Sequence, residues 1–123
     1  MSELTVETRD LEQVTLVYPR GFINAHTVRL FEGELRRLVE QRRLRIVLNC
    51  ADLAYIASAG LGAILGSIEE IREQGGDLRL SELNPTVRGI FEMLGFDQLY
   101  RIYASEWEAV SSFAAPEGGA GPA

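Results

Sequence analysis

Near the N-terminus, apolar and polar residues alternate in two short stretches, residues 4–8 and residues 14–18. A short polar segment, Asp10 to Gln13, separates the two stretches. Side chains of a strand point alternately to its two faces, so this pattern predicts two strands joined as a β-hairpin. Pro19-Arg20-Gly21 follows the second stretch, and we expect it to break that strand.

Farther along the chain, apolar residues recur at every third or fourth position, which predicts amphipathic helices. Asn24 is the expected N-cap of the first helix. The buried stripe of this helix consists of Val28, Phe31, Leu35, Leu38 and Val39. The second helix is expected over Ala59 to Gln74, and Gly75-Gly76 ends it. Its apolar residues are Leu61, Ile64, Leu65, Ile68 and Ile71.

Two further helices are predicted nearer the C-terminus. The third is expected to have Asn84 as its N-cap and Pro85 at its first helical position, and to end at Gly95. Its buried stripe consists of Val87, Ile90, Phe91 and Leu94. The fourth is expected to open with a capping box, in which Ser105 and Glu108 bond reciprocally. Its apolar side consists of Trp107, Val110 and Phe113.

Strands are predicted between these helices. Arg45 to Asn49 holds an uninterrupted apolar run, Ile46-Val47-Leu48, which indicates burial on both faces and hence the middle of a parallel sheet. Leu78 and Leu80 mark the next strand, and Leu99 to Tyr103 is the last. From residue 45 onward strand and helix alternate, which requires right-handed crossovers. The predicted fold class is therefore α/β, with a mostly parallel central sheet, an N-terminal β-hairpin at one side and about four helices.

Length and net charge indicate one globular domain and argue against a protein that binds the phosphate backbone of nucleic acids. The chain has 123 residues, and we expect residues 1–114 to form a single domain. Residues 115–123 are rich in glycine, alanine and proline, which predicts a disordered tail. The formal net charge is −6, from 12 basic and 18 acidic residues. A protein that binds the phosphate backbone needs a basic face, so we expect no nucleic-acid partner.

The sequence also indicates the cellular compartment of the protein. No apolar run is long enough to span a membrane, and Met1 to Leu4 lack the basic and apolar regions of a signal peptide. The single cysteine, Cys50, cannot form an internal disulfide and fits a reducing compartment. We therefore expect a cytoplasmic protein that does not insert into a membrane, with Cys50 as a small buried apolar residue.

The stretch from Tyr55 to Leu65 stands out because its apolar period changes from strand-like to helix-like. Ser58 lies at the change, where an N-cap belongs. Gly60 and Gly62 leave the first helical turn with almost no side chain. On position alone Ser58 is an ordinary N-cap. A hydroxyl at a bare helix terminus can nevertheless be approached by another protein, which suits modification or docking better than catalysis.

Catalytic and metal sites are poorly supported. An esterase nucleophile elbow would need glycine where the chain has Ile56, and the only histidine, His26, precedes Ser58, contrary to the order of that triad. A nucleotide-binding P-loop needs a lysine, and the sequence has none. His26 and Cys50 lie on different predicted elements, so they do not form a metal site. We expect neither an enzyme nor a cofactor.

Several segments taken together resemble the STAS domain of bacterial anti-sigma-factor antagonists. They are residues 21–24, the strand into Asn49, Asp52-Leu53, residues 55–62, Gly75-Gly76 and residues 84–92. The resemblance covers roughly residues 4 to 114, and the spacing of all the segments is specific, although each alone would be weak. It implies a STAS-like fold.

The resemblance also implies a mechanism. In such proteins a serine at the position of Ser58 is phosphorylated by a serine kinase that is itself the anti-sigma factor. The unphosphorylated antagonist binds this kinase and displaces the sigma factor, and a serine phosphatase resets the cycle. The implied partner-binding residues are Asn24, Ala25, His26, Ala57, Ser58, Ala59, Gly60 and Leu61, together with the exposed side of the second helix.

Two positions depart from the family pattern. The family usually has an acidic residue at the positions of Ala57 and Asn24, so both departures remove negative charge from the face expected to meet the partner. An alternative of another class stays open. In this alternative, the chain is a STAS scaffold or accessory subunit of a transport or signalling assembly and is not regulated by phosphorylation.

Overall fold

The structure is a computed structural model that describes residues 3–114. The residues of the predicted disordered tail lie outside this range. The elements, in chain order, are β1 (Leu4–Leu11), β2 (Val14–Ile23), α1 (Val28–Glu40), β3 (Arg45–Asn49), β4 (Leu53–Ile56), α2 (Ser58–Glu73), β5 (Asp77–Ser81), α3 (Pro85–Met93), the 3₁₀ turn η1 (Phe96–Gln98), β6 (Ile102–Tyr103) and α4 (Glu106–Ala114).

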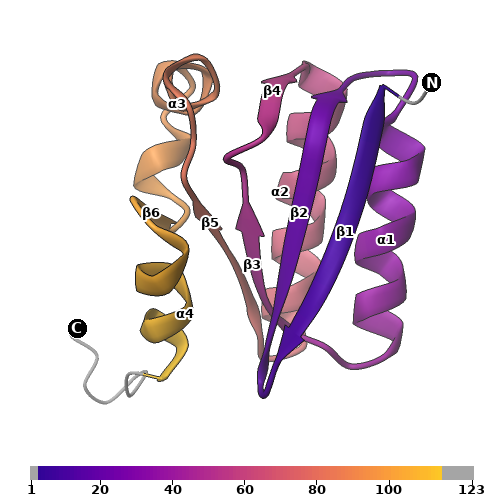
Figure 1. The fold of residues 1–123 in the computed structure, drawn as a ribbon, viewed down its shortest axis with the longest axis vertical. Helices are drawn as coiled ribbons and strands as arrows, with labels where there is room; N and C mark the ends of the chain where they lie inside the picture. The colour runs from indigo at the N-terminus through magenta and orange to yellow at the C-terminus, as the bar shows by residue number, and fades with distance from the viewer. Residues whose placement is uncertain (1–2, 115–123) are drawn as a thin grey trace.

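One sheet runs through the described residues in the order β1-β2-β3-β5-β6 (Figure 1). Strands β1 and β2 pair antiparallel as the predicted hairpin, which lies at one side, and the other pairings are parallel. Strand β4 also pairs with β2, beyond the end of β3. The α/β fold class, the hairpin and the parallel order are therefore confirmed, whereas β4 was not predicted.

The expected break at Pro19-Arg20-Gly21 is wrong, because β2 continues through to Ile23. Its pairing with β3 covers residues 15–17 and its pairing with β4 covers residues 21–23. Pro19 lies in the gap between these pairings, where a missing N–H removes no bond to β3 or β4. Gly21 takes a φ of 111°, and a Cβ there would lie 2.1 Å from the carbonyl oxygen of Glu3. Only glycine fits this close approach of β1.

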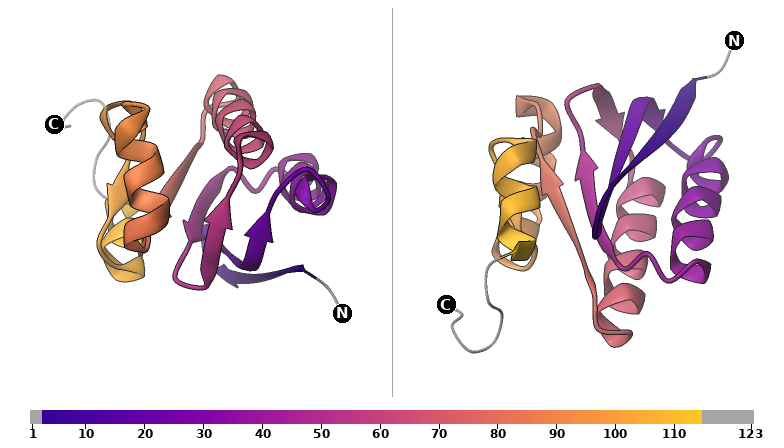
Figure 2. Two further views of the ribbon diagram at one scale, coloured as in Figure 1. Left: turned by 90° about the horizontal axis from the view of Figure 1, so that it is seen from above. Right: turned by 60° about the horizontal axis from the view of Figure 1, so that its bottom comes forward.

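Helices cover both faces of the sheet (Figure 2). Helices α1, α2 and α3 contribute to the main core, and α4 packs on the opposite face against Val14, Leu16 and Val47. The predicted stripes of α1 and α2 are largely confirmed, since the buried apolar residues of these helices are Phe31, Leu35, Leu38, Val39, Leu61, Ala63, Ile64, Ile68 and Ile71. The predicted caps of α3 and the end of α2 are confirmed as well, because Asn84 Oδ1 accepts from Val87 N (2.8 Å) and Gly75 takes a φ of 95°.

Predictions near the C-terminus hold less well. Trp107 is 75% exposed, because the face of α4 that packs on the core contains Ala109 and not Trp107. Leu94 lies after the end of α3 and is half exposed. The predicted last strand shortens to Ile102–Tyr103.

The capping box forms only in part. Glu108 N donates to Ser105 Oγ (3.2 Å). The first amide of α4, Glu106 N, donates instead to Glu82 Oε2 (2.9 Å), so a carboxylate from outside the helix helps to cap it.

Candidate functional site

Helix α2 begins at Ser58 and has no side-chain cap. Its N-cap is Ala57, which is extended (φ −92°, ψ 174°), so the prediction that Ser58 is the N-cap is wrong by one residue. The reason is a tertiary contact. Ala57 N donates to Ile23 O (2.8 Å), which continues the pairing of β4 with β2, and Ala57 O accepts the first helical bond from Leu61 N (3.0 Å). The Ser58 hydroxyl is therefore not used as a cap, and the residue is exposed.

The first turn of α2 leaves backbone donors open. Within residues 3–114 the amides of Ser58, Ala59 and Gly60 have no hydrogen-bond acceptor, as is usual for an uncapped helix start. The first turn also contains no acidic side chain. The positive end of the helix dipole is therefore left without a negative partner beside an exposed hydroxyl.

Gly60 fixes this helix end against the sheet. A Cβ at position 60 would lie 2.5 Å from Ile23 Cγ2 and 2.7 Å from Ile56 Cγ1, so the backbone of the first turn packs directly on two core side chains. Gly62 differs, because nothing lies within 4 Å of a Cβ built there. Gly60 therefore has a packing role, while Gly62 leaves the outer surface of the helix bare.

The turn after β2 lies at the same edge of the sheet. Ile23 pairs with Ile56, so the residues that follow the two strands, Asn24 and Ala57, emerge together. Asn24 Oδ1 accepts from His26 N (2.9 Å) and Thr27 N (3.2 Å). Asn24 therefore orders the turn, whereas the N-cap of α1 is Thr27, and the prediction of Asn24 as that N-cap is wrong.

Thr27 secures the same turn. Its Oγ1 accepts from Asn24 N (2.9 Å) and donates to Phe22 O (2.8 Å). Asn24 Nδ2 also donates to Glu3 Oε1 (3.4 Å), so a carboxylate lies beside the turn.

Most of the predicted site residues share this edge. Asn24, Ala25, His26, Ala57, Ser58 and Ala59 follow the paired ends of β2 and β4, and Ala25, His26, Ser58 and Ala59 are exposed. Gly60 and Leu61 instead face the core, where Leu61 is 6% exposed. They position the helix and offer no side chain to a partner.

Two aromatic residues near the edge were missed by the sequence analysis. Phe22 and Tyr55 pair across β2 and β4, and each is 45% exposed. The apolar run from Leu53 to Ile56 was the available signal for β4, but four residues without polar alternation give no clear period. With β4 unassigned, nothing placed Tyr55 beside Phe22.

Other candidate chemistry is weak. Burial raises the pKa of the Cys50 thiol to about 12, so this fully buried side chain is protonated at neutral pH and is no nucleophile. In the part of the chain that the structure describes, no group of three or more His, Cys, Asp or Glu side chains could hold a metal ion. No helix in residues 3–114 has both the length and the apolarity needed to cross a membrane.

The sequence and the fold match a known family. The STAS domain matches residues 5–109, and the chain belongs to the STAS domain family. BtrV of Bordetella bronchiseptica, by its name a candidate anti-sigma factor antagonist, is 35% identical over 94 residues, which cover 76% of this chain and 81% of BtrV. The anti-sigma F factor antagonist of Paenibacillus polymyxa is 28% identical over 109 residues, which cover 88% of this chain and 93% of the relative.

Solved structures agree on the fold. The anti-sigma factor antagonist SpoIIAA in its unphosphorylated form aligns with a TM-score of 0.76 at 23% identity, covering 90% of this chain and 96% of SpoIIAA. The phosphorylated form of SpoIIAA from Bacillus aligns with a TM-score of 0.69 at 22% identity, covering 89% of this chain and 98% of that chain. At these identities the likeness concerns the fold alone.

Proposed function

We propose that this protein is an anti-sigma-factor antagonist regulated at Ser58. Its unphosphorylated form binds an anti-sigma factor that is also a serine kinase and so frees a sigma factor. Phosphorylation of Ser58 abolishes this binding, and a serine phosphatase restores it. The protein acts in the cytoplasm and catalyses no reaction itself. The observation that carries the proposal is the exposed Ser58 hydroxyl at the uncapped start of α2.

The fold itself tolerates a phosphate at Ser58. The modification adds a charge of about −1.5 to −2. At the start of α2 this charge meets open backbone amides and the positive end of the helix dipole, which favour it by roughly 0.3–1 kcal/mol. The likeness of the chain to SpoIIAA in both its unphosphorylated and its phosphorylated form supports a single fold for the two states.

The cost of the phosphate falls on the complex. Ser58 and Ala59 are exposed beside the ordered turn at Asn24, and the aromatic pair of Phe22 and Tyr55 adds apolar surface close by. A partner that closes over the neutral Ser58 hydroxyl needs no cation at that point, so burying a phosphate there leaves its charge unmatched, at a cost on the order of 2–5 kcal/mol. At about 1.4 kcal/mol per decade, the affinity falls tens- to thousands-fold.

Glu3 lies close to Asn24, one of the two positions where the family usually has an acidic residue. Its carboxylate lies 3.4 Å from Asn24 Nδ2, so an acidic group stands beside the position where the family usually has one. We propose that Glu3 supplies part of the negative charge that a basic kinase surface would meet. Ala57 itself carries no charge, so we propose that Ser58 is recognised mainly by its position.

The proposal is tested by incubating the protein with candidate anti-sigma kinases and ATP. We expect one phosphate on Ser58, none on the Ser58→Ala variant, and normal phosphorylation of Ser67→Ala, a matched change within the same helix. Mass spectrometry locates the phosphate. If the native protein carries no phosphate with any kinase, or Ser58→Ala is phosphorylated equally, regulation at Ser58 is refuted. Co-purification with a transport or signalling assembly in that case would favour the STAS scaffold alternative.

A further inference from the structure

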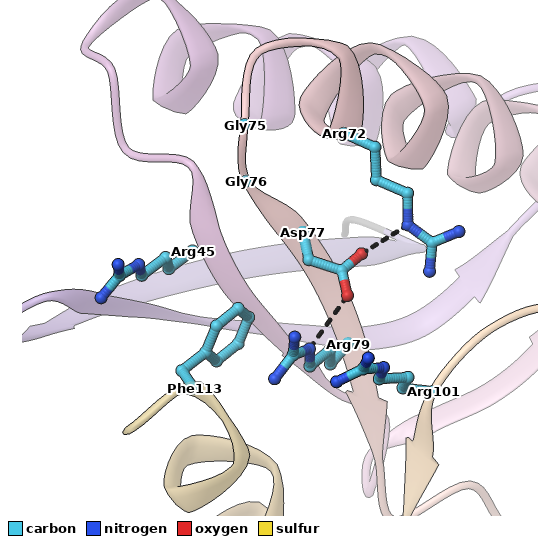
Figure 3. Close-up of a pocket in the computed structure, with 8 residues that line it drawn as sticks. All are labelled: Arg45, Arg72, Gly75, Gly76, Asp77, Arg79, Arg101 and Phe113. Carbon is cyan, nitrogen blue, oxygen red and sulfur yellow. Dashed lines mark hydrogen bonds and ion pairs between the residues drawn. The ribbon is translucent and has the colours of Figure 1, made fainter. Parts of the chain in front are cut away.

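An open pocket of about 320 Å³ lies where α2 ends and β5 begins (Figure 3). It is far from the candidate partner surface. Ser58 is the first residue of α2 and Arg72 lies in its last turn, and 16 residues at 1.5 Å per residue make the helix about 24 Å long. Whatever this pocket binds is therefore separate from the contact proposed at Ser58.

The pocket is strongly basic in a chain of net charge −6. Four arginines line it: Arg45 from β3, Arg72 from α2, Arg79 from β5, and Arg101, which directly precedes β6. Asp77 is the single acidic residue among the described residues that line it. A guanidinium group keeps its charge at any physiological pH, so these side chains set a positive potential inside the pocket.

Two of the arginines are held in fixed positions. The Asp77 carboxylate, with its side chain 11% exposed, accepts from Arg72 Nε (2.8 Å) and from Arg79 Nε (2.9 Å). Arg79 is 3% exposed, its Nη1 donates to Ser112 Oγ (2.8 Å), and its guanidinium lies 4.0 Å from the centre of the Phe113 ring. The site is therefore ordered before any ligand arrives, which lowers the entropic cost of binding.

The arrangement in space is clear in the close-up. Figure 3 shows Arg72, Arg79 and Arg101 gathered around Asp77, whereas the Arg45 guanidinium points away from them. Arg45 Nη1 instead donates to Gln13 Oε1 (2.8 Å). Arg72 uses its Nε for Asp77, so its two terminal nitrogens remain available at the half-exposed side of the pocket.

The chemistry of this group suits phosphate. The planar fork of a guanidinium matches two phosphate oxygens, and such charge-assisted bonds are among the strongest in proteins. The volume corresponds to roughly ten water molecules at about 30 Å³ each, which exceeds the needs of one phosphate group. We propose that this pocket binds a small molecule that carries a phosphate or diphosphate group, with Arg72 and Arg101 as its exposed ligands and the buried Arg79 adding positive charge beneath them.

Calorimetric titration with inorganic pyrophosphate at low salt tests this proposal on the full chain. We expect saturable binding with a Kd of about 1 mM or tighter, weakened about tenfold or more in Arg72→Gln and in Arg101→Gln. The matched control is Arg29→Gln, which removes the same charge from an exposed position on α1 and should change the Kd less than about twofold. Equal binding by all four proteins, or no saturable binding by the native protein, overturns the proposal.

A second measurement needs no variant and is insensitive to folding defects. In amide NMR spectra of the native protein, pyrophosphate should shift the signals of Gly75 and Gly76, which line the pocket, and leave that of Ser58 unchanged. Citrate at the same ionic strength tests whether phosphate is needed, and we expect it to bind more weakly. Shifts confined to Ser58 and its neighbours would place the anion at the start of α2 and refute the assignment to this pocket.

Discussion

Gly60→Ala tests whether the start of α2 is held by direct contact of its backbone with the core. The new Cβ would lie 2.5 Å from Ile23 Cγ2 and 2.7 Å from Ile56 Cγ1. Both isoleucines are fully buried, at 0% and 1% exposure, so neither can move aside without disturbing its neighbours. Overpacking of this kind costs about 1–3 kcal/mol. Alanine recovers up to about 1 kcal/mol through its helix propensity, so we expect a net loss of about 1–2 kcal/mol.

Urea denaturation of Gly60→Ala and of the matched variant Gly62→Ala measures this effect. Position 62 has the same change of helix propensity but nothing within 4 Å of the new Cβ, so that variant should gain up to about 1 kcal/mol. With m of about 1–3 kcal/mol/M, the midpoint of Gly60→Ala should fall by roughly 1 M while that of Gly62→Ala rises. Equal midpoints for the two variants would refute the packing role of Gly60.

Three further predictions concern the partner surface and the core. Ser58→Asp should weaken binding to the partner kinase at least tens-fold in a pull-down or titration. The thermal midpoint of the free protein should stay within a few degrees, because the added charge meets open backbone amides at the start of α2. Equal binding by the variant and the native protein would contradict the switch. Tyr55→Ala should weaken the same binding by about 1 kcal/mol or more and cost no more than about 1 kcal/mol of stability, because the residue is 45% exposed in the free protein. Trp107→Ala, on α4, should bind normally. A loss of binding in both variants or in neither would contradict the assigned surface. The third prediction concerns Cys50, whose pKa burial raises from 9.0 to about 12. The unfolded thiol loses its proton as the pH rises through 9 while the folded thiol keeps it. Between pH 9 and pH 10 the free energy of unfolding of the native protein should therefore fall by about 1 kcal/mol more than that of Cys50→Ala. Parallel pH profiles for the two proteins would contradict this prediction.

Much of the fold could be predicted because burial leaves a periodic trace in the sequence. The stripe from Phe31 to Val39 and the apolar run Ile46-Val47-Leu48 are each long enough to define a period, and both lie in the core as expected. Glycine and proline marked the ends of α2 and α3 through local chemistry alone. These features depend on residues close together in the sequence.

What could not be predicted depends on contacts between distant residues. The bond from Ala57 N to Ile23 O keeps Ala57 extended and moves the start of α2, and no local pattern encodes it. Pro19 would end an ordinary strand, but β2 changes partners at that point. The basic pocket combines Arg72, Arg79 and Arg101 from separate segments of the chain, so only the tertiary structure brings them together.

The bond between Ala57 and Ile23 also decides how recognition of Ser58 has to be studied. The residue before Ser58 is bonded to the end of β2, a strand far away in the sequence. The turn at Asn24, which Thr27 orders, lies beside it. A synthetic peptide that copies residues 53–73 would keep the amino acids around the hydroxyl and lose the platform that presents it. Such a peptide should therefore be a poor substrate for a kinase that accepts the intact domain, and surveys of specificity based on short linear motifs would overlook this serine.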